Sequence, residues 1–155
     1  MTRSTATTRV WTHADFDEMG WHDATIHAFA IDQDQFELMF DLDYIVEWVR
    51  PEDEGGYFSF WVAPATLVFE GVQDVSIEIA FPHIRHIDVF DLHREPAGKP
   101  DKKGVQDWAW RLELADGAIT FRANGFRQHF RAEPVHRSIH PVAVAERGGI
   151  SFARG

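Results

Sequence analysis

The sequence contains no cysteine, which excludes disulfide scaffolds, thiolate zinc sites and cysteine nucleophiles. No run of about 18 apolar residues is present, so we expect no membrane-spanning helix. The Gly-x-Ser-x-Gly, His-Glu-x-x-His and glycine-rich phosphate-binding patterns are also missing, which disfavours serine hydrolases, zincins and nucleotide enzymes. The threonine-rich residues 1–13 lack the apolar core of a secretory signal. These absences predict a soluble, cytoplasmic protein.

The 155 residues are 45% hydrophobic and 14% aromatic, which excludes disorder over most of the chain. This length suits one domain with its own core. We therefore predict a single domain over residues 1–155, with a disordered tail at 1–13 and a loose tail at 141–155.

Charge is distributed unevenly along the chain. Residues 1–80 carry 16 Asp and Glu against 3 Lys and Arg, a net charge of −13, whereas residues 81–155 carry 9 against 12, a net charge of +3. An overall charge of −10 disfavours binding to nucleic acids. The plainest interpretation is that the two halves pair their opposite charges.

Alternating apolar and polar residues predict strands through most of the chain. The segment 36–44 places apolar residues on one face and acidic residues on the other, which indicates a half-buried strand. A preceding strand over 25–31 would pair with it if Gln33-Asp34 is a two-residue turn, which sets Ile31 opposite Phe36. Residues 44–49 are predicted to bend into a helix, and Ala14–Gly20 to form a short helix or turn.

The second half holds two strong turn pairs, Asp116-Gly117 and Asn124-Gly125. Two-residue loops at both would make a three-stranded meander over residues 108–132, with Leu114 opposite Ile119. About eight strands in all predict an α+β fold, mainly antiparallel β: a sandwich or half-open barrel with this C-terminal meander.

The first candidate site is the acidic face of the 35–48 segment, formed by Glu37, Asp41, Asp43 and Glu47. Like charges at this spacing repel one another unless they are solvated, paired with arginine or bound to a cation. We favour a solvated outer face. On that interpretation, removing Asp41 and Asp43 should raise stability at low salt.

The second candidate is an arginine row on the outer face of the meander. The predicted register sets Arg111 opposite Arg122 and Arg122 opposite Arg127, which is unfavourable unless an anion meets them. That anion could be a substrate, an acidic partner or the acidic strand of this chain. We favour a partner or the chain itself.

Two further features could carry binding or chemistry. His22 and Asp23 could act as a general base, although a hydrogen-bonded histidine in the core is the plainer interpretation. Trp48 and the aromatic run 57–61 could form a partner-binding patch, although a core strand is favoured. No three ligands converge, so we predict no metal and no cofactor.

Three motifs occur in an order that resembles a family of small uncharacterised bacterial proteins, followed by a Gly-Phe-x-Gln-like strand at 125–128. The motifs are Trp21-His22-Asp23, the Asp-Leu-Asp-Tyr-Ile-x-Glu-Trp segment at 41–48, and the Phe-Trp-Val-Ala-Pro-Ala-Thr-Leu-Val-Phe-Glu segment at 60–70. This resemblance implies no catalytic residues. The opening motif is also similar to that of immunity proteins of bacterial toxin systems, which are small, acidic and cytoplasmic.

Together these features predict a bacterial binding protein of the immunity type that captures a basic protein through its acidic surface. The candidate binding residues are His22, Asp23, Asp41, Asp43, Glu47, Trp48, Arg111, Arg122 and Arg127. The alternative is a metal-assisted hydrolase or small-ligand enzyme that uses His22, Asp23, Asp41 and Asp43.

Overall fold

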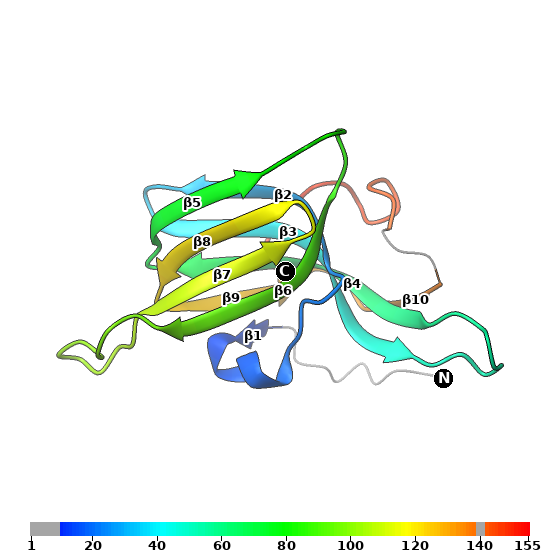
Figure 1. Cartoon of the computed structure of the whole chain (residues 1–155), viewed down its shortest axis with the longest axis horizontal. Helices are drawn as coiled ribbons and strands as arrows, with labels where there is room; N and C mark the ends of the chain where they lie inside the picture. Colours follow the sequence, from blue (N-terminus) through cyan, green and yellow to red (C-terminus); the bar gives the residue numbers. More distant parts are fainter. Residues whose placement is uncertain (1–9, 139–141) are drawn as a thin grey trace.

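The computed structural model describes residues 10–138 and 142–155 and forms one open, mainly antiparallel β-sheet (Figure 1). The predicted β-rich fold is confirmed. Within the described residues the sheet has ten strands, and the one helix is a short 3-10 helix. The elements are β1 (Val10–Thr12), η1 (His13–Glu18), β2 (Thr25–Asp32), β3 (Glu37–Val49), β4 (Ser59–Glu70), β5 (Gln73–Ile79), β6 (Ile87–Pro96), β7 (Trp108–Leu114), β8 (Gly117–Ala123), β9 (Gly125–Phe130) and β10 (Val135–Arg137).

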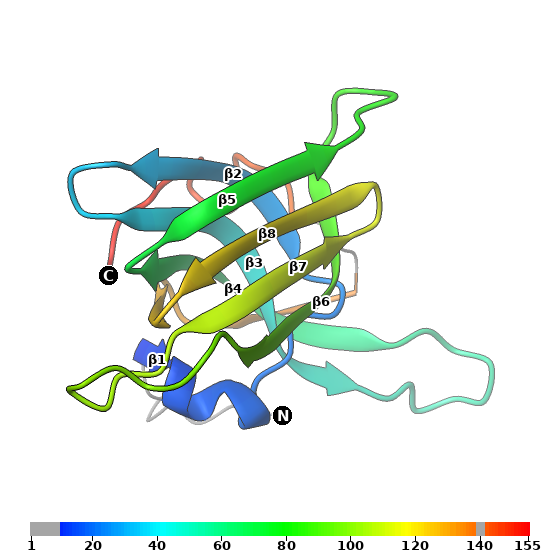
Figure 2. The ribbon, with the colours of Figure 1, turned by 60° about the vertical axis from the view of Figure 1, so that its left-hand side comes forward.

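The sheet folds over on itself into a half-open barrel (Figure 2). Strand order is β1-β9-β4-β3-β2-β6-β7-β8-β5, and β10 pairs with β4 outside this path. The two halves join only where Thr25 pairs with Asp88 and Ile26 with Ile87. This narrow join lets the half formed by β1, β9, β4, β3, β2 and β10 face the half formed by β6, β7, β8 and β5 across one core.

Aromatic rings fill the space between the two halves. Phe69 of β4 meets Phe121 of β8 edge-to-face at 4.6 Å and Trp110 of β7 at 5.1 Å. Phe16 of η1 packs against the same core and stacks on Trp21 at 5.8 Å. Edge-to-face pairs add to the stabilisation from burial alone, so these contacts hold the halves together.

The prediction for β3 is correct for the face that is buried but wrong for the turn that joins β2 to β3. Leu38, Phe40 and Leu42 are buried, as the alternation requires. Residues 33–36 form a four-residue loop, so Ile31 pairs with Leu38 and Phe36 is exposed with φ +55°. The register differs from the expected one by two residues, which keeps the same side chains facing the core.

The predicted three-stranded meander is wrong at its second turn. β7 and β8 do form a hairpin, with Leu112 opposite Ile119, two residues from the expected register. β9, however, crosses at Asn124 to the other half of the sheet and pairs with β4. Alternation determines which face of a strand is buried but not which strand lies beside it.

Other segments also differ from expectation. Residues 44–49 continue β3 as strand instead of bending into a helix. The short helix is confirmed as η1. Within the 1–13 segment, residues 10–12 form β1 and pair with β9, and residues 1–9 lie outside the described residues.

Gly117 is required at the β7–β8 turn. Its φ is +155°, and a Cβ there would lie 1.9 Å from the backbone oxygen of Glu78. We expect Gly117→Ala to lower the free energy of unfolding by more than about 1 kcal/mol, measured by urea denaturation. The control is Gly20→Ala, because a Cβ at Gly20 meets nothing within 4 Å. Equal effects of the two substitutions would contradict this account of the turn.

Candidate functional site

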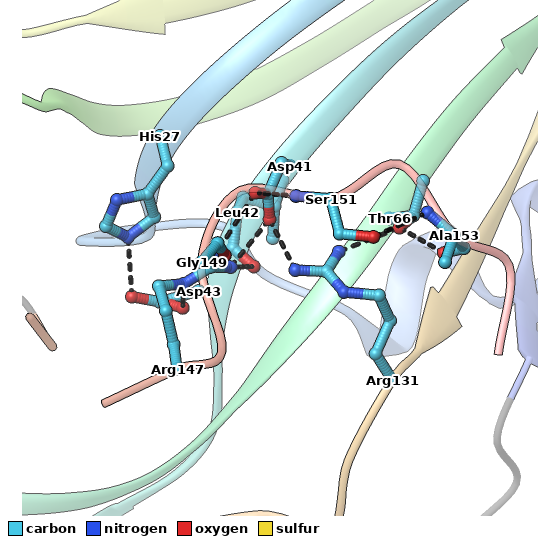
Figure 3. A network of polar contacts seen from close by, with 10 residues as sticks. All are labelled: His27, Asp41, Leu42, Asp43, Thr66, Arg131, Arg147, Gly149, Ser151 and Ala153. Atoms are coloured by element: carbon cyan, nitrogen blue, oxygen red, sulfur yellow. Dashed lines mark hydrogen bonds and ion pairs between the residues drawn. The ribbon is translucent and has the colours of Figure 1, made fainter. Parts of the chain in front are cut away.

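The acidic face of β3 is buried, which corrects the prediction of a solvated surface. Asp41 is 0% exposed and Asp43 is 1% exposed. The C-terminal segment 142–155 runs over this face and delivers Arg147 to both carboxylates (Figure 3). The sequence predicts a loose tail there, but the side chain of Arg147 is only 1% exposed.

Asp41 accepts four hydrogen bonds from three residues. Its Oδ1 accepts from Nη2 of Arg131 and from Nη2 of Arg147, each at 2.6 Å. Its Oδ2 accepts from Nη1 of Arg147 and from the backbone N–H of Ser151, each at 2.9 Å. Arg147 therefore binds this carboxylate in the bidentate geometry that makes such pairs strong.

Asp43 completes the cluster on the same face. Its Oδ1 accepts from Nε of Arg147 at 2.8 Å, and its Oδ2 lies 2.8 Å from Nε2 of His27. Arg147 also donates from Nη1 to the backbone oxygen of Gly149 at 2.7 Å and from Nη2 to that of Leu42 at 3.2 Å. Every N–H direction of this buried guanidinium thus meets an acceptor, as burial of a cation requires.

The network extends to β4 and to the end of the chain. Arg131 donates from Nη1 to Oγ1 of Thr66 at 2.8 Å, and that hydroxyl donates to the backbone oxygen of Ala153 at 2.5 Å. At the edge of the cluster Arg154 pairs with Glu37. We call the five side chains at its centre the ion cluster: His27, Asp41, Asp43, Arg131 and Arg147.

The local sequence explains why Arg147 reaches the sheet. Gly148 and Gly149 both have left-handed backbones, with φ of +87° and +88°. The N–H of Gly149 donates to the oxygen of Val144 at 2.8 Å, which closes a compact turn around the arginine. Only glycine adopts such consecutive angles without strain, so the Gly-Gly pair forms the turn that carries Arg147.

Burial and hydrogen bonding act in opposite directions on these groups. Burial alone raises the pKa of Asp43, but the hydrogen bonds from His27 and Arg147 outweigh it and hold the pKa below its usual value. Burial likewise opposes the charge on Arg147, yet its bonds to Asp41 and Asp43 raise its pKa above the usual value. Both ions therefore stay charged when buried.

This arrangement suits stabilisation better than catalysis. The carboxylates are satisfied by arginine, His27 and a backbone N–H, so they offer no free oxygen to a metal or a substrate. Within residues 10–138 and 142–155, no group of three or more His, Asp or Glu could hold a metal ion. We conclude that the ion cluster fastens the C-terminal segment to the sheet.

The other predicted site residues lie apart. His22 and Asp23 form an exposed pair, Nδ1 to Oδ2 at 3.1 Å, in a turn where Asp23 has φ +66°. They are not part of the ion cluster. The expectation of a core histidine at position 22 is wrong, because its side chain is 70% exposed.

The predicted arginine row does not exist, because the β7–β8 register differs from the expected one by two residues and β9 lies in the other half of the sheet. Arg111 is opposite Thr120, and Arg122 is opposite Ala109. Arg122 instead binds Asp107 at 2.6 Å and Asp74 at 3.3 Å. Arg127, on β9, lies 3.5 Å from Glu70.

Arg111 and Arg122 line a surface hollow of ≈ 490 Å³ over β6, β7 and β8. Asp74 and Glu95 line the same hollow, so its charge is mixed. This mixture does not single out an anion as a ligand.

Sequence reasoning found the two carboxylates but missed the cation that holds them. Arg131, Arg147 and His27 are not among the residues that the sequence predicts for this site. The available signal was the Arg-Gly-Gly sequence at 147–149 in a basic half that follows an acidic half. His136 and His140 have the spacing of a His-x-x-x-His pair in the sequence, but His140 lies outside the described residues.

Glu47 and Trp48 lie on a hairpin that extends away from the barrel. This arm consists of β3 residues 44–49, the loop 50–58 and β4 residues 59–63 (Figure 1). Trp48 is 45% exposed and packs against Phe60 at a ring distance of 5.5 Å. The predicted core strand is confirmed for Phe60, which is 5% exposed, but not for Tyr57, which is 93% exposed.

Comparisons with known proteins bring no further assignment. No family model, no curated protein and no solved structure matches the chain. Among the residues described, no helix has the length and apolar character needed to cross a membrane. The resemblances drawn from the sequence motifs stay predictions.

The first test of the ion cluster compares two arginines of the same segment. Removing one partner of a buried ion pair costs about 3–5 kcal/mol. We expect a loss in this range for Arg147→Met, measured by urea denaturation. Arg154→Met removes a half-exposed pair and should cost at most about 1 kcal/mol. Similar losses for both variants would rule out a special role for Arg147.

A second test follows from the pKa of Asp43. Because the folded state holds the pKa of Asp43 below its usual value of 3.8, the carboxylate contributes stability above that pH and loses the contribution as pH falls through the folded pKa. We expect the stability difference between wild type and Asp43→Asn to be full at pH 6 and to shrink below about pH 4. Unfolding free energies across this range measure it. A difference that stays constant would contradict the assigned pKa direction.

Proposed function

We propose that this protein binds a basic protein partner through the arm, in the manner of an immunity protein. The observation that carries the proposal is the combination of exposed aromatic rings and consecutive acidic residues at the end of a projecting hairpin. The partner would approach the acidic loop by electrostatic attraction and dock on the rings.

Exposed aromatic side chains on the arm support a docking role. Tyr57 is 93% exposed, Phe58 is 51% exposed and Trp48 is 45% exposed. Phe58 packs edge-to-face on Trp48 at 6.2 Å, so the two rings form one patch. Tyr and Trp are enriched among the residues that dominate binding energy at protein interfaces. Large apolar groups gathered at one exposed site are typical of interaction surfaces.

The charge of the arm supports a basic partner. Glu52, Asp53 and Glu54 are consecutive, and all three are exposed. Arg50 is the one basic residue of the loop. An acidic loop beside aromatic anchors would accelerate association with a basic surface and weaken it with acidic ones.

The ion cluster also favours binding through the arm over the metal-assisted hydrolase alternative. It closes the outer face of β3 with the C-terminal segment, and its carboxylates are fully engaged. The alternative, a metal-assisted hydrolase using His22, Asp23, Asp41 and Asp43, therefore has no observation in its favour. The exposed arm is the better place for function.

Quantitative affinity capture from a bacterial lysate tests the proposal. The bait proteins are wild type, Tyr57→Ser with Phe58→Ser, and a loop variant with Glu52→Gln, Asp53→Asn and Glu54→Gln. We expect a basic protein that wild type retains and both variants lose by about tenfold or more, since aromatic anchors contribute about 2 kcal/mol or more. Raising the salt concentration should release it.

The matched control is Ile84→Ser, which removes an apolar side chain that is 97% exposed and lies outside the arm. This variant should retain the partner as wild type does. If the arm variants retain every protein that wild type retains, or if the proteins lost are acidic, the proposal is wrong.

A further inference from the structure

A small pocket lies at the end of β3 opposite to the arm, where the loop between β2 and β3 meets the turn between β4 and β5 (Figure 2). Its volume is ≈ 230 Å³. Apolar side chains from both sides form most of its lining, namely Ile31, Phe36, Leu38, Val72 and Val75. A concave site with an apolar lining and a few polar groups is typical of sites for small molecules.

Backbone hydrogen bonds hold the two sides of the pocket in place. The N–H of Val72 donates to the backbone oxygen of Phe36 at 2.9 Å, which joins the β4–β5 turn to the β2–β3 loop. Within that loop, Oδ1 of Asp32 accepts from the N–H of Asp34 at 3.1 Å and from the N–H of Gln35 at 3.2 Å. A ligand therefore meets walls that are already ordered, which lowers the entropic cost of binding.

Phe36 has a backbone conformation that bulky side chains rarely adopt. Its φ is +55°, in the left-handed region. Core packing does not compensate for this strain, because the ring is 66% exposed. Strained residues of this kind gather at ligand sites. The ring lines the pocket together with Ile31, which is 60% exposed, so the strain serves to present an apolar surface beside the pocket.

The loop brings negative charge to this pocket. Asp32 lines it, and the exposed Asp34 follows in the same loop. Among the described residues, neither carboxylate forms an ion pair with lysine, arginine or histidine. Glu37, by contrast, is paired with Arg154. A cation bound beside Asp32 would supply the countercharge that the chain itself does not provide there.

We propose that this pocket binds a small amphipathic cation, namely a primary amine on a short arylalkyl body. A cavity of about 150 Å³ holds benzene, so a volume of ≈ 230 Å³ has room for a phenyl ring with a short chain. The ring would pack against Phe36 and Ile31, and the ammonium group would face Asp32. The pocket is separate from the arm, so this inference does not depend on the proposed function.

Titration of the full chain with three matched ligands tests the charge preference. At neutral pH phenethylamine is positive, phenethyl alcohol is neutral and hydrocinnamate is negative, and all three carry the same ring. Chemical-shift changes in NMR spectra give the affinities and the location of binding. We expect phenethylamine to bind about fivefold more tightly than phenethyl alcohol, which matches one ion pair near the surface, and hydrocinnamate to bind most weakly. The shift changes should be confined to residues 31–38 and 72–75.

Two variants separate binding from folding. Phe36→Asn removes the ring but suits the left-handed backbone, which asparagine adopts readily. We expect it to weaken phenethylamine binding by about tenfold or more without lowering the free energy of unfolding in urea. Asp32→Asn keeps a side-chain oxygen for the loop hydrogen bonds, so it should leave the fold intact and make phenethylamine and phenethyl alcohol bind equally. The control Ile84→Ser, at a residue that does not line the pocket, should bind all three ligands as wild type does.

The other outcomes would overturn the inference. Equal affinities of wild type for the three ligands would exclude a preference for cations. Shift changes outside residues 31–38 and 72–75, or no shift changes at all, would exclude the pocket as the site. A large loss of stability in Phe36→Asn would show that the ring serves folding instead of binding. None of these results alters the capture experiment with the arm variants, which decides the proposed function separately.

Discussion

The ion cluster is the interaction on which the order of the C-terminal segment and the burial of the β3 carboxylates depend. Two carboxylates on β3 are removed from water, and they stay charged because Arg131 and Arg147 satisfy them. Desolvating such ions costs several kcal/mol each, which is offset only when nearly every donor and acceptor is paired. Arg147 comes from a segment about 106 residues away in sequence. The order of the C-terminal segment and the burial of Asp41 and Asp43 are therefore two aspects of one interaction, and neither is expected without the other.

Much of the fold was predictable, because alternation is a local property. The pattern in 36–44 identified Leu38, Phe40 and Leu42 as core, and the pattern around Asp116-Gly117 identified Leu114 and Ile119, which are also buried. Neighbours were harder to predict. Asn124-Gly125 has the composition of a hairpin turn, yet β9 leaves the hairpin and pairs with β4, where Phe126 lies opposite Phe69. A strand carries information about its buried face and much less about its partner.

The candidate site was located but misinterpreted for a similar reason. Whether Asp41 and Asp43 are solvated depends on what covers β3, and the covering segment lies at the other end of the chain. The charge asymmetry between the two halves was the useful signal, since the acidic half supplies both carboxylates and the basic half supplies both guanidiniums. The predicted partners were the wrong arginines, because Arg111, Arg122 and Arg127 were placed by a meander that does not form.

The C-terminal segment covers the outer face of β3, which leaves the arm as the exposed candidate for binding. The functional proposal therefore depends on the ion cluster being formed in solution. Hydrogen exchange at neutral pH tests this most directly. The N–H of Ser151 donates to Asp41 and the N–H of Gly149 donates to Val144, so both amides should exchange far more slowly than those of a free peptide. Exchange at free-peptide rates over residues 142–153, with β3 itself protected, would show that the segment is not fastened and would contradict the account.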